Sequence, residues 1–363
     1  MNQLVHISLF LFFMAATCTA NAQKLKAGFD KQEYMELLRL YSRQGDSTFY
    51  KDIPRSNKYR RIYRSPVVGL ENRWDLCVSK DSVAVISLRG TIDKPMSWLA
   101  NFYSAMVPAK GQATLADDYT FDYHLADNPR ASVHIGWLVC TGFLSRDILP
   151  KLDSCYKVGI KDYIILGHSQ GGAISYLLTS HFNSLKKQGK IPADVVFKTY
   201  CSASPKPGNL YYAYDYEHMT YGGWAYNVVN SADWVPETPV AVQTIYDNND
   251  VNPFSNARAT IRKQKFPQNT ALSYIYARLK KPSLKANRRN QKILGKMLSK
   301  YIKGHLKGYK EPKYYPSSNY VRTGTYIVLL ADDAYYKKFP DDKDNIFVHH
   351  LLQPYLYLAE QLP

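Results

Sequence analysis

The sequence predicts an α/β fold with a mostly parallel central sheet flanked by helices. Two observations predict it. Short apolar strand patterns alternate with helical patterns along the chain, and a glycine-rich turn joins one strand directly to a helix. The 363 residues are 45% hydrophobic and 21% charged, which is ordinary for a globular protein and excludes a disordered chain, a collagen or a coiled coil.

The elements can be assigned from the spacing of apolar residues. In the segment 32–41, Tyr34, Leu37, Leu38 and Tyr41 have helical spacing. The strand patterns at 74–78 and 83–88 flank the turn 80–82 and predict a hairpin. Further helices are predicted at 97–102, from 133 toward 156, after 173 and from 350, and further strands at 163–166, 195–200, 226–229 and 326–330.

The first 22 residues predict a secretory signal peptide. They contain no charged residue, and the apolar run 9–16 is followed by Ala20-Asn21-Ala22, a small-x-small cleavage pattern. Cys18 suggests a lipoprotein signal as an alternative, although Thr17 before it fits poorly. We expect export to the periplasm, the outer membrane or the medium, and a single domain over 23–363. No later apolar run reaches the ~20 residues of a membrane span.

Export affects how the cysteines are interpreted. Cys77, Cys140, Cys155 and Cys201 remain after cleavage, and an oxidising compartment allows them two disulfides in three possible pairings. None of them has zinc-finger spacing, so the sequence predicts no structural metal.

The positive charge is concentrated in one segment. The chain has 47 Lys and Arg against 30 Asp and Glu, a net charge of +17. Between Arg258 and Lys313 there are 17 basic residues and one acid, Glu311, and the rest of the chain is nearly neutral. This pattern predicts a basic helical insertion at about 255–315, rather than a general binder of polyanions.

A basic amphipathic helix is predicted within this insertion, with Pro282-Ser283 as a helix start. Ile293, Leu294, Leu298 and Ile302 share one side, and the lysines of Lys292–Lys307 share the opposite side. Two interpretations stay open: a helix packed on the domain, or contact with an anionic membrane surface. A non-catalytic surface-binding protein is therefore a second candidate function. Nucleic acid is not an expected partner, because no stacking motif accompanies the basic run.

The sequence Gly167-His168-Ser169-Gln170-Gly171-Gly172-Ala173 is the strongest chemical signal. It lies between an apolar strand and a helix, in the context of a serine held on a sharp strand-turn-helix connection. Glycines on both sides allow the close approach that this turn requires. Ser169 is therefore the candidate nucleophile.

A serine hydroxyl needs a histidine to take its proton and a carboxylate to orient that histidine. In this type of fold the acid follows the serine in sequence, and the histidine follows the acid. Asp233 is a candidate acid after the strand 226–229. Only His305, His349 and His350 come after it.

These motifs, with others in the same order, resemble the class 3, or fungal-type, lipase family of α/β-hydrolases. The resemblance is piecewise, from about Leu70 to the C-terminus. Its pieces are Arg89-Gly90-Thr91, Ser97-Trp98-Leu99 in place of the family's Asp-Trp pair, Val133 to Trp137, the GHSQGGA turn, Ser204 to Asn209 and Asn230 to Pro236.

The resemblance implies an α/β-hydrolase fold and roles for particular residues. It implies Ser169 as nucleophile, Asp233 as orienting acid, and His350 as base in preference to His349, because His350 precedes Tyr355-Leu356 by the family's spacing. Thr91 and the amide of Gln170 correspond to the oxyanion donors. His134 and His168 are expected to be structural. Two departures are Gln170, where the family usually has Leu, and the basic insertion, which is a candidate cap over the site.

The expected activity is ester hydrolysis without a metal or organic cofactor. The segment 97–106 carries Trp98, Leu99, Phe102 and Met106, and suggests a lipase-type lid or acyl wall over a lipid substrate. The tyrosine-rich stretch 211–224 suggests instead a wall for aromatic or sugar-linked esters, so a soluble carboxylesterase is the alternative.

Overall fold

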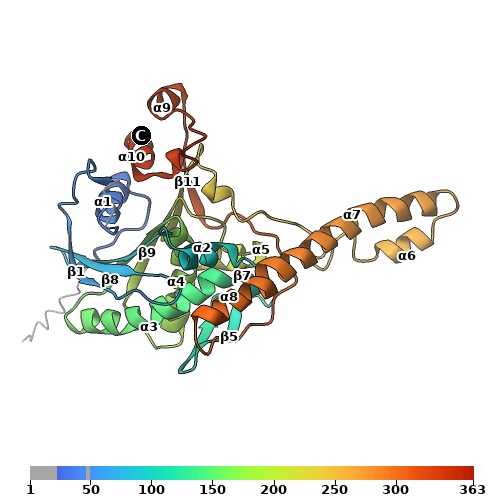
Figure 1. The fold of residues 1–363 in the computed structure, drawn as a ribbon, viewed down its shortest axis with the longest axis horizontal. Helices are drawn as coiled ribbons and strands as arrows, with labels where there is room; N and C mark the ends of the chain where they lie inside the picture. Colours follow the sequence, from blue (N-terminus) through green and yellow to red (C-terminus); the bar gives the residue numbers. More distant parts are fainter. Residues whose placement is uncertain (1–22, 46–49) are drawn as a thin grey trace, which may run out of the picture.

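The computed structural model describes residues 23–45 and 50–363. The predicted signal peptide, residues 1–22, lies outside the described residues. A seven-stranded sheet forms the centre of the molecule (Figure 1). In spatial order its strands are β1 (Tyr59–Arg64), β2 (Trp74–Ser79), β3 (Val83–Leu88), β8 (Asp162–His168), β9 (Val196–Ser202), β10 (Ala225–Asn230) and β11 (Thr325–Leu329).

The sheet is mostly parallel, as predicted. The strands from β3 to β11 pair in parallel, and β2 is antiparallel to both of its neighbours. β2 and β3 form the predicted hairpin, with Trp74 opposite Leu88. Right-handed crossovers between parallel strands need a helix on a sheet face, which explains the alternation seen in the sequence.

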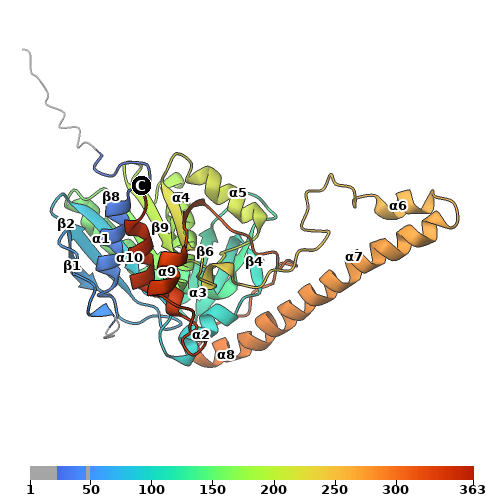
Figure 2. The same ribbon diagram turned by 90° about the horizontal axis from the view of Figure 1, so that it is seen from above.

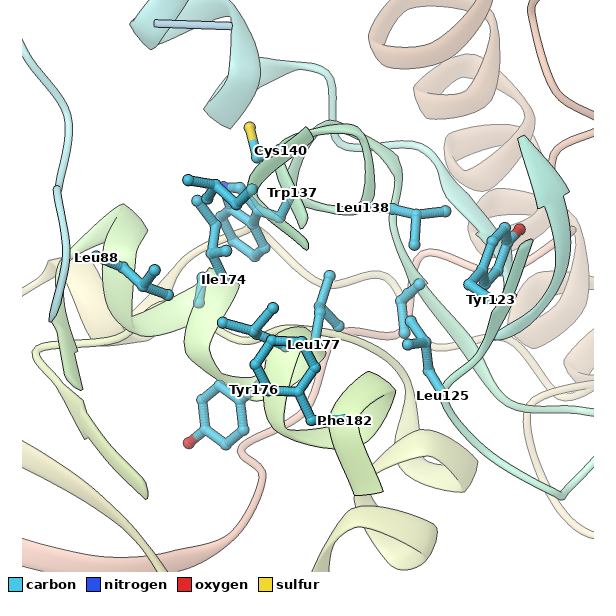
Figure 3. Packing of buried hydrophobic residues seen from close by; sticks show 14 of the residues in the cluster. Leu88, Tyr123, Leu125, Trp137, Leu138, Cys140, Ile174, Tyr176, Leu177 and Phe182 are labelled. Carbon is cyan, nitrogen blue, oxygen red and sulfur yellow. The ribbon is translucent and has the colours of Figure 1, made fainter. Parts of the chain in front are cut away.

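Helices cover both faces of the sheet (Figure 1). α3 (Ile135–Lys157) and α4 (Gln170–Lys187) lie on one face, and Figure 3 shows Trp137 and Leu138 of α3 close to Ile174 and Leu177 of α4. α1 (Lys31–Tyr41) and α10 (Leu352–Glu360) pack on the other face. Since both faces are covered, β3 and β8 are buried along their whole length.

The remaining elements lie around the sheet. They are α2 (Pro95–Phe102), β4 (Met106–Pro108) paired with β7 (Ser132–His134), the hairpin β5 (Lys110–Ala116) and β6 (Tyr119–His124), α5 (Leu210–Met219), η2 (Val235–Glu237), α9 (Asp333–Lys338) and η4 (Val348–His350).

The tyrosine-rich stretch became α5, which the sequence analysis did not predict as a helix. Asn209 caps it by accepting from the amide of Tyr212. Tyr211, Tyr212 and Tyr216 are buried in the core on the α3 side of the sheet. These three rings therefore do not form the exposed substrate wall considered above.

The basic insertion is a long helical arm that extends away from the body (Figure 2). It consists of α6 (Ala257–Arg262), α7 (Gln268–Asn290), the π-helix η3 (Gln291–Met297) and α8 (Leu298–His305). The helix start predicted at Pro282-Ser283 was wrong, because α7 begins at Gln268 and continues through Pro282. Pro282 is exposed, so the carbonyl that loses its amide partner there faces water.

The four cysteines are all buried and free, so neither of the disulfides that the sequence allowed is formed. Within 23–45 and 50–363, no helix has the length and apolar character needed to cross a membrane.

Candidate active site

Ser169 lies on a sharp turn between β8 and α4. Its φ of 60° and ψ of −130° are strained for a residue with a side chain, and its amide donates to the carbonyl of Ser202 at 2.9 Å. A Cβ on Gly167 would lie 2.1 Å from the Gly171 backbone, and one on Gly171 would lie 2.3 Å from the Leu88 carbonyl oxygen. The two glycines thus permit the tight turn, which leaves Ser169 half-exposed.

Asp233 and His350 form a buried pair, 117 residues apart in sequence. Nδ1 of His350 lies 2.7 Å from Oδ2 of Asp233. Asp233 also accepts a bond from the hydroxyl of Tyr355 at 2.8 Å on Oδ2 and one from the amide of Val235 at 3.0 Å on Oδ1. With three donors the carboxylate is fixed in place, and it holds the imidazole of His350 in one orientation.

His168 ties this pair to the turn that carries Ser169. Its Nε2 lies 2.8 Å from the carbonyl oxygen of His350, and its Nδ1 lies 3.0 Å from Oγ of Ser202. Complete burial lowers the pKa of His168 to about 3, so the ring is neutral. A neutral imidazole donates from one nitrogen and accepts at the other, which fits a donor to the His350 carbonyl and an acceptor from Ser202.

The adjacent His349 points elsewhere. Its Nδ1 lies 2.8 Å from the hydroxyl of Tyr335, and its Nε2 lies 2.9 Å from Asp341. His305 lies on α8 and is exposed. Of the three histidines that follow Asp233 in the sequence, the structure pairs His350 with it.

The two residues predicted as oxyanion donors lie beside the turn and are joined through Asn101. The side-chain amide of Asn101 donates to Oγ1 of Thr91 at 2.9 Å. Its Oδ1 accepts from the side chain of Gln170 at 2.9 Å and from the indole of Trp137 at 3.1 Å. Gln170 also donates to the carbonyl of Ser97 at 3.0 Å, which connects the start of α4 to α2.

The Trp137 bond fixes the orientation of the Asn101 amide. An indole N–H can only donate, so the oxygen of Asn101 faces Trp137 and its nitrogen faces Thr91. The hydroxyl oxygen of Thr91 is then an acceptor, and its hydrogen is free to be donated to another group.

His134 has a structural position in the same region, as expected from the sequence. Its Nδ1 accepts from the amide of Trp137 at the start of α3, at 3.3 Å, and its Nε2 lies 3.0 Å from the carbonyl of Asn101. Burial lowers its pKa to about 3. Among the described residues, no group of three His, Cys, Asp or Glu side chains could hold a metal ion.

Aromatic rings line the approach to His350. Phe347 lies 5.9 Å from the His350 ring, and Trp98 and Trp234 lie 6.1 Å and 5.5 Å from Phe347 between ring centroids. Phe102 stacks on Trp98 at 6.2 Å and is 58% exposed. Trp98 and Phe102 of α2, with Trp234 before η2 and Phe347 before η4, therefore form an apolar rim next to the Asp233–His350 pair.

The sequence analysis missed Asn101 and the role of Tyr41. The hydroxyl of Tyr41 accepts from the amide of Gly90, immediately before Thr91, at 2.8 Å. Asn101 follows the apolar Trp98-Leu99-Ala100. A polar residue directly after an apolar run in a short helix could have indicated a side chain with a specific hydrogen-bonding role. Tyr41 fitted an apolar helical stripe, and nothing in the sequence distinguished its hydroxyl.

The chain was compared with known proteins. Residues 85–243 match the family model for class 3 lipase. No curated protein sequence matches the chain significantly. Similar solved structures include the Lip2 lipase of Yarrowia lipolytica, at 19% identity over 60% of this chain and 77% of that one, with a TM-score of 0.44. The Rhizomucor miehei lipase propeptide complex is 18% identical over 59% of this chain and 65% of that one, with a TM-score of 0.40.

The family match begins within β3 and ends beyond Asp233, so it includes the turn that carries Ser169 and both residues predicted as oxyanion donors. Residues 85–243, somewhat less than half of the chain, are therefore similar to the class 3 lipase family, and this match supports a lipase-like serine ester hydrolase.

Proposed function

We propose that the chain hydrolyses acyl esters of lipids with Ser169 as nucleophile, His350 as general base and Asp233 as the acid that orients His350. The observation that carries the proposal is the 2.7 Å contact between His350 and Asp233, held by His168 against the strained turn of Ser169. A histidine that a carboxylate orients in this way activates a serine hydroxyl when its Nε2 takes the hydroxyl proton.

The reaction balances without a cofactor. Oγ of Ser169 attacks the ester carbonyl carbon while its proton passes to Nε2 of His350, and the carbonyl oxygen becomes an oxyanion. The hydroxyl of Thr91 and the backbone amide of Gln170 donate to this oxyanion. The bond to the alcohol oxygen then breaks, and the leaving alcohol takes the proton from His350. Water repeats the sequence on the acyl-enzyme and releases the fatty acid and free Ser169.

The rim supports an apolar acyl group in the substrate. Phe102, Trp234 and Ile346 are 58%, 40% and 58% exposed at the approach to His350. An exposed apolar patch of this kind favours an acyl chain over a sugar. Burial of Tyr211, Tyr212 and Tyr216 weakens the case for a soluble aromatic or sugar ester, and leaves Tyr214 and Tyr221 as the exposed tyrosines of that stretch.

A pair of substrates tests the proposal. The wild-type protein should hydrolyse a long-chain triglyceride emulsion faster than a soluble butyrate ester, and Ser169→Ala should lose turnover of both. Wild-type turnover by Ser169→Ala would refute the nucleophile. Turnover of the butyrate ester but not of the triglyceride, with no activation at an interface, would indicate a carboxylesterase.

Export is part of the proposal, and it rests on the uncharged apolar sequence 1–22 and its Ala20-Asn21-Ala22 pattern. The mature protein should begin at Gln23 and be found outside the cytoplasm. N-terminal sequencing of the protein from cell fractions tests this, and an intact Met1 on cytoplasmic protein would contradict it.

An anionic membrane surface is the proposed partner besides the substrate. The predicted Lys292–Lys307 helix packs on the domain, and this packing limits how much of the helix can contact a membrane. Ile302 is buried, and the Leu294 carbonyl accepts from the Ala105 amide at 3.3 Å. Gly295 allows this approach, because a Cβ there would lie 2.9 Å from the Ala105 side chain. This helix is fixed to the domain by part of its apolar side, and its lysines, together with the exposed Met297 and Tyr301, remain to face a lipid surface.

A further inference from the structure

The outer part of the arm packs only loosely, with α6 against α7 and Lys280 over the ring of Tyr246. No residue from 248 to 286 is buried, although this stretch includes all of α6 and most of α7. Figure 2 shows α6 folded back beside α7 at the far end, away from the sheet. α7 has 23 residues, a length of ~35 Å, so its outer half lies well beyond the body.

This outer half carries an apolar stripe. Leu272, Ile275 and Leu279 fall within an arc of about 60° at 100° per residue, and they are 42%, 52% and 54% exposed. Phe266, in the turn between α6 and α7, is 82% exposed. Three large aliphatic side chains on one face of a helix normally pack against something.

Closer to the body, the same helix face is packed. Asn287, about 60° from Leu272 around the helix, is buried and donates to the carbonyl of Pro316 at 2.9 Å. Beyond it, Leu294 and Gly295 contact Ala105. The arm is therefore packed at its root and exposed at its tip.

The charge of the tip indicates what could cover the stripe. Residues 257–290 contain ten basic residues and no acidic one. On α7, Lys281 lies opposite to the stripe, and Arg278 and Lys285 flank it about 60° and 80° from Ile275; across the part of the chain that the structure describes no salt bridge involves these three residues. An apolar stripe with a basic opposite side and flanks is the pattern of a helix that lies in the interface of an anionic bilayer.

We propose that residues 257–285, the arm tip, dock the protein on an anionic phospholipid bilayer by inserting Phe266 and the stripe of Leu272, Ile275 and Leu279. A second copy of the chain is a poor occupant, since its own tip would bring another eight basic residues. This docking site is additional to the proposed lipid hydrolysis. Its biological role rests on the proposed function, but the binding itself does not require Ser169.

The root of the arm places this docking next to the active site. η3 contacts Ala105, three residues after the end of α2, and α2 leads to Asn101 and the aromatic rim. The hydroxyl of Tyr103 is bonded to those of Tyr309 and Tyr314, at 2.9 Å and 3.0 Å, which further joins the return of the arm to this segment. A tip held at a bilayer would keep the rim close to its substrate.

The test measures sedimentation of full-length mature Ser169→Ala protein with vesicles of phosphatidylcholine alone or mixed with phosphatidylglycerol. A stripe variant carries Leu272→Gln, Ile275→Gln and Leu279→Gln. A tip-charge variant carries Arg278→Gln, Lys281→Gln and Lys285→Gln. The matched control removes the same charge at the root with Lys292→Gln, Lys296→Gln and Lys300→Gln.

The parent protein should sediment with the mixed vesicles and should not sediment with the vesicles of phosphatidylcholine alone. Both tip variants should lower the partition coefficient at least about tenfold, and the root control should lower it much less. Equal binding of the stripe variant, an equal loss in the root control, or equal binding to neutral vesicles would each overturn the proposal. The proposal would also be overturned if the parent protein were a dimer in the absence of vesicles and the stripe variant were a monomer.

The same variants made with Ser169 present separate the two proposals. The two tip variants should hydrolyse a soluble short-chain ester at the parental rate, because the arm tip is remote from Ser169. If the parent has no esterase activity but binds vesicles as described, the proposed function fails and the docking site stands. If the parent has normal esterase activity but does not bind vesicles, the docking site fails and the proposed function stands.

Discussion

Asn101 donates its side-chain amide to the hydroxyl oxygen of Thr91 at 2.9 Å, and Trp137 prevents that amide from turning over. This contact makes Thr91 an acceptor on its protein side and leaves its hydroxyl hydrogen for an oxyanion. Oxyanion stabilisation depends on donors that are already in position before charge develops. Asn101 is therefore a positioning residue for Thr91.

Removing either side of this contact should slow the chemical step. Thr91→Val loses the donor itself, and we expect kcat to fall by about 10²-fold with little change in KM. Asn101→Ala leaves Thr91 intact but free to rotate, and we expect a smaller fall of about tenfold. Steady-state kinetics on a soluble ester measures both effects. Asn183→Ala, which removes an exposed-side amide of α4, is the control, and a KM effect alone in Asn101→Ala would contradict the positioning role.

The two adjacent histidines give a matched pair. His350→Ala should lower kcat by at least about 10³-fold, because no other group can take the proton of Ser169. His349→Ala removes the hydrogen bonds to Tyr335 and Asp341 and the ring contact with Tyr336, and should keep kcat within a few-fold while lowering the melting temperature. Loss of activity in His349→Ala with His350→Ala active would reverse the assignment of the base.

The side chain of Gln170 should matter for stability more than for catalysis. Gln170→Leu restores the residue usual in the family and keeps the backbone amide, but it leaves the buried carbonyl of Ser97 without its donor. We expect the free energy of unfolding to fall by about 1–3 kcal/mol and kcat to change less than tenfold. Urea unfolding and ester kinetics on one preparation test this. A 10²-fold fall in kcat at unchanged stability would instead place the side chain in the oxyanion site.

Three buried histidines predict a loss of stability in acid. Burial lowers the pKa of His134 and of His168 to about 3 and that of His181 to about 4, from 6.5. The unfolded chain then binds more protons below pH 6.5 than the folded chain. The contribution of these neutral histidines to the free energy of unfolding is complete above pH 6.5, and it is lost as the pH falls toward the pKa values of the folded protein.

His181 tests this effect away from the active site, since it packs edge-on against Phe121. His181→Gln should reduce the slope of unfolding free energy against pH, between 6.5 and about 4.5, by about 1.4 kcal/mol per pH unit. Urea titrations across this range provide the slopes. An unchanged slope would show that His181 is protonated in the folded protein.

Features set by short segments could be predicted from the sequence. α1, the β2–β3 hairpin, the strand before Ser169 and the turn itself depend on residues close together in the chain, and all of them were predicted. Asp233 and His350 could be selected only through their order and a family pattern. Their contact depends on how β10 and η4 meet, which no local pattern specifies.

The sequence is less informative where one pattern fits two environments. Ile302 in Lys292–Lys307 is packed on the domain and Leu272 to Leu279 are exposed, although both segments have amphipathic spacing. Which of them finds a partner depends on tertiary contacts such as Gly295 on Ala105. Asn101 was missed for the same reason, since its partners Thr91, Trp137 and Gln170 are 10 to 69 residues away.

Reaction of the mature protein with a fluorophosphonate probe, followed by peptide mapping, tests the central claim most directly. A serine activated by His350 and Asp233 should be labelled at Ser169, and Ser169→Ala and His350→Ala should not be labelled. Labelling at another residue, or folded wild-type protein that does not react, would contradict the account of Ser169 as the activated nucleophile.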